Sequence, residues 1–478
     1  MSSQGDGQRD GQKAFPSAGR AQALLQAHRL ASFGVRSATA LPDASGVSFH
    51  SGRVKPGDAF FALPGEHGHG IAFADAALEK GAAFIVSDRP HPRGIVVADP
   101  KALLLQLGKE ARGLFSGAVV GITGSAGKTS TKAMVAATLG AYASPGNFNT
   151  PLALAQTLIE TALQQEAQGA PRRALVLEMG IDQKGEMDGL VALVKPTHAV
   201  LTLVGESHLS GLGTVEDVAY EKGKLLKSAP VALMHALCRG YYPDLALGKT
   251  PERVYTYGLD EEPCEEDAVS FCGRVLTAGP DRQTLEVFGV RLSLPYPGRH
   301  MAANAVAAMS LAKLLNEDLH GAAARLERVR LEPGRLEVKE RPGLTIIDDS
   351  YNSNPASAAL ALEALAKFPR PHTAILGDML ELGERSGDLH RLLGERARAV
   401  DALLTVGLEA RAVAQGHPEA KHFDELEGLL ASLKSHRLRG TVLVKGSRGM
   451  RLERVVSCLE ADLKTDPETN NATLGAGA

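Results

Sequence analysis

The chain has 478 residues, a formal net charge of −3, and 44% hydrophobic and 22% charged residues. This length exceeds what one hydrophobic core supports and indicates roughly three domains. The near-neutral charge excludes a general attraction to nucleic acid, and no apolar run approaches the ~18 residues of a membrane span. The four cysteines, Cys238, Cys264, Cys272 and Cys458, lack Cys-x-x-Cys spacing, which indicates reduced cytoplasmic thiols rather than disulfides or a zinc site.

The ends of the chain differ in pattern from its interior. Residues 1–20 and 464–478 lack apolar periodicity, so we expect disordered tails, and the polar start does not fit a signal peptide. Between them, apolar runs alternate with Ala- and Leu-rich helical runs, which predicts an α/β fold with mostly parallel sheets. The expected strands are Phe84–Ser87, Gly94–Ala98, Ala118–Thr123, Ala174–Glu178, Ala199–Val204, Thr345–Asp348, Thr373–Gly377, Ala402–Val406 and Thr441–Lys445.

Two boundaries divide this pattern. One lies near Ser116, and the other lies at Leu331–Arg335, where Pro and Gly follow an expected helix from Ala302 to about Val329. Residues 250–293 are rich in strands and turns and predict a meander that closes the middle part. The expected domains are therefore 21–116, 117–330 and 331–463.

The most informative local motif is a glycine-rich turn, Gly124–Ser130, between an apolar run and a helical pattern over Lys132–Leu139. Backbone N–H groups of such a turn, and the helix N-terminus behind it, bind phosphate oxygens. We expect Lys128 to reach the outer phosphates and Thr129 to ligate Mg²⁺. The alternative is a glycine turn with a surface lysine, since Ile122 replaces the first glycine of the phosphate-loop pattern.

Candidate metal ligands follow two further strands. Glu178 ends one strand and His208 comes after another, and ligands of open α/β sheets bind at the carboxyl ends of strands. With Thr129 they form an oxygen-rich set that suits Mg²⁺ or Mn²⁺. Taken alone, Glu178 also fits a helix cap or a surface carboxylate, and His208 fits a structural or solvated imidazole.

Two predicted helices hold further polar side chains. The capping-box sequence Thr214–Asp217 begins a helix with Lys222 and Lys224, for which a solvated face is the simplest interpretation. A second, Ala-rich helix places His300 and Asn304 on one face. This pair either contacts a base or simply faces solvent.

The segment Thr345–Pro355 combines a strand, a polar loop and a helix start, with Asn354 as a suitable N-cap before proline. The loop holds a polar cluster that packing alone does not require: Asp348, Asp349, Tyr351 and Asn352.

In their order and spacing, these motifs resemble those of the Mur ligases, the ATP-dependent ligases of peptidoglycan synthesis. The resemblance covers residues 30–459, and its last three motifs favour the dipeptide-adding branch. The motifs are Thr123–Ser130, Gly146–Asn149, Glu178–Gly180, Ser207–Leu209, Glu221–Gly223, Gly298–His300 with Asn304, Pro333–Arg335, Asp348–Asn354, Gly377–Gly383 and Val444–Arg448.

The resemblance implies an N-terminal domain that binds a UDP sugar, a central phosphate-loop ATPase and a C-terminal Rossmann-like domain that closes over the site. It implies ATP and Mg²⁺, with Thr129, Glu178, His208 and a carbamoylated Lys222 at the metal. The residues implied for ATP are Gly124, Ser125, Ala126, Gly127, Lys128, Thr129 and Ser130, with His300 and Asn304 at the adenine, Asp349 at the ribose and Arg335 at the γ-phosphate. Those implied for the other substrates are Ser51, Asn147, Asn149, Tyr351, Asn352, Lys445 and Ser447.

The implied reaction activates a carboxylate, which is a poor electrophile. ATP would phosphorylate the terminal carboxylate of UDP-N-acetylmuramoyl-tripeptide, and the amine of D-alanyl-D-alanine would attack the acyl phosphate. Lys128, Arg335 and Mg²⁺ would neutralise the transferring charge, with His208 and Lys222 completing the catalytic set, while domain closure excludes water. We expect a cytoplasmic monomer with no nucleic-acid partner.

Some loops depart from the family pattern. His50–Arg53 stands where the family has Asp-Ser-Arg, which leaves only Ser51 in register, and Gly65–Gly70 is also altered. Thr150 and Pro151 follow Asn149 directly, where the dipeptide-adding branch has a longer Gly-Pro loop.

Other functions stay open at this point. A tripeptide-forming relative typically has an Asn-Pro-Arg motif that this sequence lacks, and the amidotransferase-linked relative has a four-cysteine zinc ribbon. A folylpolyglutamate-type synthetase uses the same chemistry on another substrate. A non-catalytic nucleotide-binding scaffold of cell-wall assembly would not need Lys128, Thr129, Glu178 and His208 together.

Overall fold

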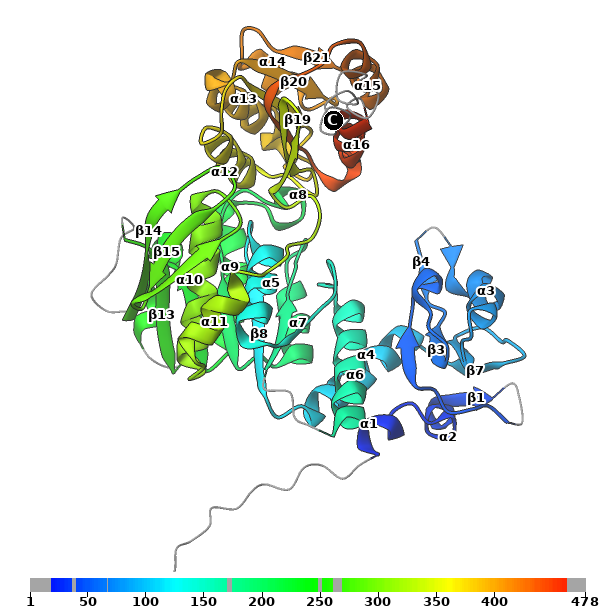
Figure 1. The fold of residues 1–478 in the computed structure, drawn as a ribbon. Helices are drawn as coiled ribbons and strands as arrows, with labels where there is room; N and C mark the ends of the chain where they lie inside the picture. Colours follow the sequence, from blue (N-terminus) through cyan, green and yellow to red (C-terminus); the bar gives the residue numbers. More distant parts are fainter. Residues whose placement is uncertain are drawn as a thin grey trace, which may run out of the picture. The chain divides into compact units, whose positions relative to one another are not determined.

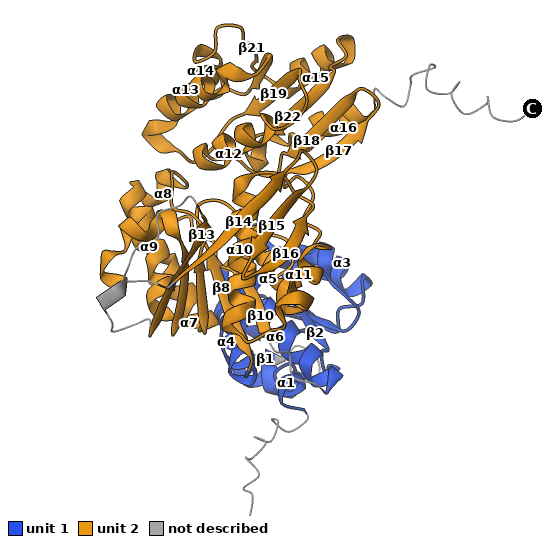
Figure 2. Cartoon of the chain, turned by 60° about the vertical axis from the view of Figure 1, so that its left-hand side comes forward, with its two compact units in different colours: residues 1–116, 151–171 blue, residues 117–150, 172–478 orange. Residues whose placement is uncertain are grey.

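The computed structural model describes residues 19–36, 40–66, 68–169, 174–247, 252–260 and 269–461. The chain forms two compact units, residues 1–116 with 151–171 (unit 1) and residues 117–150 with 172–478 (unit 2), as Figure 2 shows. The expected tails lie almost wholly outside the described residues, although the first helix already begins at Arg20. Cys264 and the acidic stretch 261–267 also lie outside them.

Unit 1 contains a five-stranded sheet of order β1-β7-β6-β3-β2, parallel except for β1. Helix α6 packs against α4 and β2, so residues 151–171 join this unit although the expected boundaries place them in the central domain. The elements are α1 (Arg20–Ala23), α2 (Ala27–Leu30), η1 (Ala31–Phe33), β1 (Gly34–Arg36), β2 (Gly46–Ser48), η2 (Ser51–Arg53), β3 (Asp58–Phe61), β4 (Pro64–Gly65), β5 (Gly68–His69), η3 (Gly70–Phe73), α3 (Ala74–Glu79), β6 (Phe84–Ser87), β7 (Gly94–Val97), α4 (Pro100–Leu114) and α6 (Pro151–Gln168).

Unit 2 contains a nine-stranded sheet of order β16-β15-β14-β13-β12-β11-β8-β10-β9. Figure 1 shows α10 beside the strands β13, β14 and β15 of this sheet. Its strands are parallel from β9 to β14, and β14, β15 and β16 form an antiparallel meander. The elements are β8 (Ala118–Thr123), α5 (Lys128–Leu139), β9 (Tyr142–Ala143), β10 (Ala174–Glu178), α7 (Glu186–Val194), β11 (His198–Leu201), α8 (Leu209–Leu212), α9 (Val215–Ser228), β12 (Val231–His235), η4 (Ala236–Tyr241), η5 (Pro243–Leu247), β13 (Arg253–Leu259), β14 (Val269–Ala278), β15 (Gln283–Val287), β16 (Val290–Leu294), α10 (Arg299–Leu314) and α11 (Leu319–Leu326).

The rest of unit 2 is a six-stranded sheet of order β17-β18-β22-β19-β20-β21, parallel except for β17. Its core includes Ile346, Ile375 and Val444, which are fully buried together with side chains of α15 and α16. The elements are β17 (Glu337–Arg341), β18 (Leu344–Asp349), α12 (Pro355–Leu365), β19 (His372–Gly377), η6 (Gly383–Arg385), α13 (Ser386–Arg396), η7 (Ala397–Ala399), β20 (Ala402–Val406), α14 (Arg411–Gln415), β21 (Lys421–Phe423), α15 (Leu426–Ser435), β22 (Gly440–Lys445), η8 (Arg448–Met450) and α16 (Glu453–Ala461).

Two helix predictions differ from the structure. The helix expected over 302–329 is two helices, α10 and α11, because Asn316 adopts a left-handed φ of 55° and Asp318 then caps α11. Helix α5 begins at Lys128 instead of Lys132. This earlier start places the lysine of the phosphate loop at the first helical residue.

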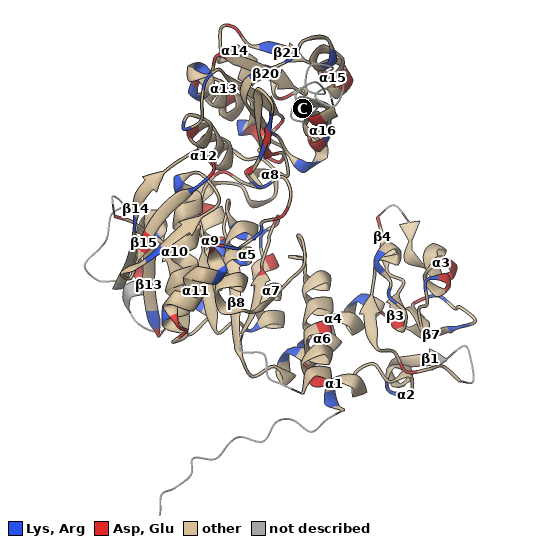
Figure 3. Cartoon of the chain, viewed as in Figure 1, with Lys and Arg blue, Asp and Glu red and all other residues tan. Residues whose placement is uncertain are grey.

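The mostly parallel α/β architecture is confirmed. Within the described part of the chain, every helix is too short or too polar to cross a bilayer. Lys and Arg are interspersed with Asp and Glu along the ribbon of both units (Figure 3), as the small net charge leads one to expect.

Candidate nucleotide and metal site

The phosphate loop between β8 and α5 is closely packed against the end of β11. The Thr202 hydroxyl donates to the Ala126 carbonyl at 2.5 Å. Gly124 has a φ of 151°, and a Cβ there would lie 1.9 Å from Thr202 Oγ1, so the loop requires glycine. Gly127, the N-cap of α5, offers no side-chain hydrogen bond, which leaves the helix N-terminus available to an anion.

Lys128 connects several of the predicted site residues. Its ammonium donates to the Gly124 carbonyl at 2.8 Å. Burial lowers the pKa of Lys128, the carboxylates of Glu178 and Asp182 oppose this shift, and the positive charge of Arg335 adds to it. Three side chains predicted from separate motifs, Lys128, Glu178 and Arg335, are therefore close enough to influence one another.

Glu178 ends β10, which lies beside β8 in the sheet, and its side chain is buried. Its Oε1 accepts a hydrogen bond from Asn149 Nδ2 at 3.3 Å. Its Oε2 is buried without a hydrogen bond, and Lys132 Nζ lies 3.6 Å away. Because a buried carboxylate oxygen without a hydrogen bond is destabilising, the geometry fits a cation ligand.

The solvated face expected for Lys222 is wrong. Lys222 lies on α9 with only 1% of its surface exposed, because this face of the helix packs into unit 2. Burial lowers its pKa to about 7, helped by the charge of Lys128 and opposed by Asp182. Lys224, by contrast, is only partly buried and pairs with Asp188 at 2.8 Å.

Arg335 comes from the segment that follows α11 and reaches the phosphate loop. Its Nη2 donates to Thr129 Oγ1 at 3.1 Å, and its guanidinium lies 3.9 Å from the centre of the Tyr351 ring. Asn354, which caps α12 as predicted, also donates through Nδ2 to the Ser125 carbonyl at 2.7 Å. The segment 335–354 therefore contacts the loop and the start of α5 through two side chains.

A second polar group surrounds Lys445. Its ammonium lies 2.5 Å from Asp349 Oδ2 and donates to the Asn352 carbonyl at 2.9 Å. Burial lowers the pKa of Lys445, while the Asp349 charge opposes the shift. Burial lowers the pKa of His300 to about 4, and the charges of Asp349 and Lys445 act on the same imidazole in opposite directions. The Nδ1 of His300 is buried without a hydrogen bond. A neutral imidazole with an unsatisfied nitrogen fits a position beside a polar ligand.

Asn304 lies next to the phosphate loop. It is buried on α10, and a Cβ at Gly127 would lie 3.2 Å from its Oδ1. The face that His300 and Asn304 share is therefore directed into unit 2 and not into solvent.

The remaining predicted substrate residues differ in setting. Ser447 accepts from the Leu380 N–H at 2.9 Å and donates to the Ser353 carbonyl at 3.3 Å. Asn147 is exposed. Ser51 belongs to unit 1, where its carbonyl accepts from the Lys80 ammonium at 2.9 Å.

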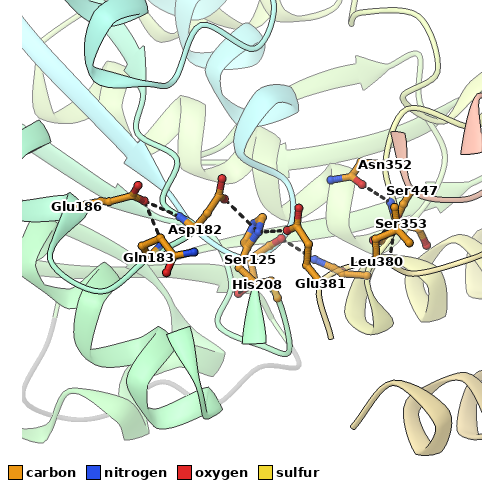
Figure 4. Close-up of polar contacts among 12 residues, drawn as sticks. Ser125, Asp182, Gln183, Glu186, His208, Asn352, Ser353, Leu380, Glu381 and Ser447 are labelled. Carbon is orange, nitrogen blue, oxygen red and sulfur yellow. Dashed lines mark hydrogen bonds and ion pairs between the residues drawn. The ribbon is translucent and has the colours of Figure 1, made fainter. Parts of the chain in front are cut away.

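Sequence reasoning missed two carboxylates that contact His208. Asp182 Oδ1 lies 3.0 Å and Glu381 Oε2 lies 2.5 Å from His208 Nδ1 (Figure 4). Among the described residues, this is the one group of three or more His, Cys, Asp or Glu residues whose ligand atoms all lie within 4.8 Å of one another. The available signals were the position of Asp182 four residues after Glu178 and that of Glu381 inside the motif Gly377–Gly383.

Comparison with known proteins places these features in one family. The catalytic domain of the Mur ligase family matches residues 43–109, the Mur ligase middle domain matches 122–312, and the Mur ligase glutamate ligase domain matches 334–448. The UDP-N-acetylmuramoyl-tripeptide–D-alanyl-D-alanine ligase of Escherichia coli is 31% identical over 357 residues, which are 72% of this chain and 76% of the relative. The ligase of the same name from Bacillus subtilis is 31% identical over 393 residues, 76% of this chain and 80% of the relative.

A solved structure agrees with these sequence matches. The MurF ligase from Thermotoga maritima in complex with ADP has a TM-score of 0.72 and 28% identity, covering 88% of this chain and 98% of that one. The sequence matches and the structural match thus point to the same family. The chain belongs to the Mur ligase family of ATP-dependent amide ligases, with the three-domain α/β architecture of that family.

Proposed function

We propose that this chain joins D-alanyl-D-alanine to UDP-N-acetylmuramoyl-tripeptide and converts ATP to ADP and phosphate. The names of its relatives support this substrate pair. The observation that carries the use of ATP is the contact between Arg335 and Thr129, because it brings a cation from beyond α11 to the start of α5, where a γ-phosphate would lie. A phosphoryl group held there meets both Lys128 and Arg335.

The protein's own groups would position and neutralise the transferring phosphoryl group. The N–H groups of Gly124–Ser130 and the N-terminus of α5 would hold the phosphates, and Lys128 and Arg335 would stabilise negative charge as it develops. His300 and Asn304 would contact the adenine and Asp349 the ribose. The unsatisfied Nδ1 of His300 supports the first of these assignments.

A divalent cation fits the donor set of Thr129, Glu178, His208 and Lys222. The buried, unsatisfied Glu178 Oε2 supports a cation at this place. When bound, Mg²⁺ would neutralise phosphate charge as a Lewis acid. Lys222 would contribute as a carbamate, since an amine with a pKa of about 7 is substantially neutral near pH 7 and nucleophilic toward carbon dioxide.

The domain boundaries are proposed at 21–116, 117–330 and 331–463, and each family match lies within one of these ranges. A cytoplasmic location and a monomeric state stay predictions. The proposed contacts to the UDP-linked peptide and the acceptor involve Ser51, Asn147, Asn149, Tyr351, Asn352, Lys445 and Ser447.

The test measures phosphate release with ATP and a matrix of donors and acceptors. UDP-muramoyl dipeptide, UDP-muramoyl tripeptide and a folate are each combined with D-alanyl-D-alanine, single amino acids or glutamate. We expect steady turnover only with the tripeptide and D-alanyl-D-alanine. Turnover of the dipeptide donor with a single amino acid would instead make the enzyme a tripeptide-forming ligase, and turnover with only a folate and glutamate would overturn the cell-wall assignment.

A further inference from the structure

The three side chains around His208 come from separate loops of unit 2. Asp182 follows β10, His208 precedes α8, and Glu381 follows β19 in the C-terminal sheet. Figure 4 shows both carboxylates directed at the imidazole. Because His208 and Glu381 are 173 residues apart in sequence, their contact joins the central and C-terminal parts of unit 2.

The backbone holds both partners in an unusual conformation. His208 has a φ of 53° and Glu381 a φ of 66°, a left-handed region that residues with a Cβ adopt at a cost in free energy. The loops also meet directly, since the Ser210 N–H donates to the Glu381 carbonyl at 3.2 Å. The side chains of two residues with left-handed backbones thus meet, and a backbone hydrogen bond from Ser210 joins their loops, an arrangement that an incidental surface ion pair does not require.

The carboxylate loops are themselves fixed. The Glu186 carboxylate accepts from the backbone N–H groups of Asp182 and Gln183 at 2.7 and 3.0 Å. On the other side, the Leu380 N–H donates to Ser447 Oγ at 2.9 Å, which ties the Glu381 loop to the end of β22 (Figure 4). The backbone at or next to each carboxylate residue is therefore held by contacts that do not depend on His208.

A carboxylate beside a histidine controls which ring nitrogen can bind a metal. A carboxylate that accepts the Nδ1–H holds the tautomer in which Nε2 is unprotonated, and this nitrogen is then the metal ligand. Carboxylates that orient ligating histidines in this way typically change metal affinity tenfold to a hundredfold. In this chain, one such carboxylate is supplied by the C-terminal domain.

We propose that Glu381 is a positioning residue for His208, so that divalent-cation affinity rises when the C-terminal domain contacts the central one. Asp182 orients the imidazole from within the central domain, and Glu381 completes the arrangement on contact. This inference rests on the proposed role of His208 as a metal ligand.

The test measures Mn²⁺ binding by electron paramagnetic resonance with a non-hydrolysable ATP analogue, on wild type, Glu381→Ala and Glu381→Gln. We expect the Mn²⁺ dissociation constant to rise about tenfold or more in Glu381→Ala and less in Glu381→Gln, which keeps an acceptor oxygen. Glu381 is 55% exposed at its side chain, so both variants should fold, as circular dichroism would verify.

The matched control is Arg385→Gln. Arg385 ends η6, four residues after Glu381, and pairs at 3.7 Å with Glu206, two residues before His208. Wild-type Mn²⁺ affinity is expected for this variant. An equal loss in Arg385→Gln would overturn the proposal, because the interface as a whole would then be responsible.

A further variant separates the inference from the role on which it rests. If His208→Ala binds Mn²⁺ as tightly as wild type, His208 is not a ligand and both fail. If His208→Ala loses affinity while Glu381→Ala does not, His208 is a ligand and only the positioning role of Glu381 is wrong.

Discussion

Lys128 and Lys222 lie near each other, yet the structure gives them different chemistry. Lys128 is at the start of a helix that attracts anions, whereas Lys222 is buried on α9 with a pKa lowered to about 7. Burial is the main cause of the lowered pKa of Lys222, and the positive charge of Lys128 lowers it further. One lysine suits charge neutralisation and the other suits covalent modification.

Lys128→Ala is expected to lower kcat about 100-fold or more while the fold persists, since the loss of one preorganised positive group at a developing charge has about this effect. Phosphate release and circular dichroism would measure the two properties. Lys227→Ala, which removes an exposed lysine on α9, should behave as wild type. Near-normal turnover of folded Lys128→Ala would contradict its assignment.

Lys222→Ala is expected to be inactive and to regain part of its activity with a short carboxylic acid that replaces the carbamate. The reason is that the cavity left by the buried side chain would admit a carboxylate beside the cation. Activity is measured across a titration of acetate. Full activity of Lys222→Ala without acid would exclude a carbamate ligand.

At the scale of elements, sequence predicted strands better than helix ends. All nine expected strands are present, because strands buried on both faces of a parallel sheet are continuous apolar runs. The break between α10 and α11 was missed because Ala-rich sequence lies on both sides of it and one left-handed asparagine produces it.

The residues of the candidate site also fall into those that the sequence predicts and those that only the structure reveals. The phosphate loop could be predicted because its residues are contiguous and glycine marks its geometry. The burial of Lys222 and the pairing of His208 with Glu381 could not, since each depends on tertiary packing between segments far apart in sequence. The resemblance to the Mur ligases pointed to Lys222, but only the structure explains why the pKa of its amine is lowered.

Gly124→Ala is expected to reduce the free energy of unfolding by at least about 1–3 kcal/mol, the usual strain of a disallowed backbone conformation, and to weaken ATP-analogue binding. The added methyl group would overlap Thr202 Oγ1. Gly140→Ala is the control, because Gly140 also has a positive φ but no atom near its Cβ. Urea unfolding and calorimetry would show whether the clash adds to the backbone strain.

At the scale of the whole molecule, the C-terminal domain contributes side chains to a site centred on another sheet. Arg335, Asn354 and Glu381 all contact residues of the central part. A site assembled in this way is complete only when both parts meet, which is a route to excluding water before a reactive acyl phosphate forms.

Arg335→Ala is expected to lower kcat much more than it raises the dissociation constant of ATP. A contact made on closure stabilises the transition state more than the ground state. Steady-state kinetics and equilibrium binding of an ATP analogue would separate the two effects. A variant that binds ATP poorly yet retains its kcat would show that Arg335 serves ground-state binding instead.

Helix α6 has a consequence for how the chain is made. Unit 1 includes residues 151–171, so the polypeptide leaves this unit after Ser116, builds β8, α5 and β9 of the next, and then returns. On the ribosome, the first 116 residues emerge without the helix that covers α4, whose Leu104 and Leu107 are buried in the finished protein. The N-terminal unit therefore cannot complete its fold until residues 117–150 of the next unit have been synthesised, so the two units do not fold strictly one after the other during translation.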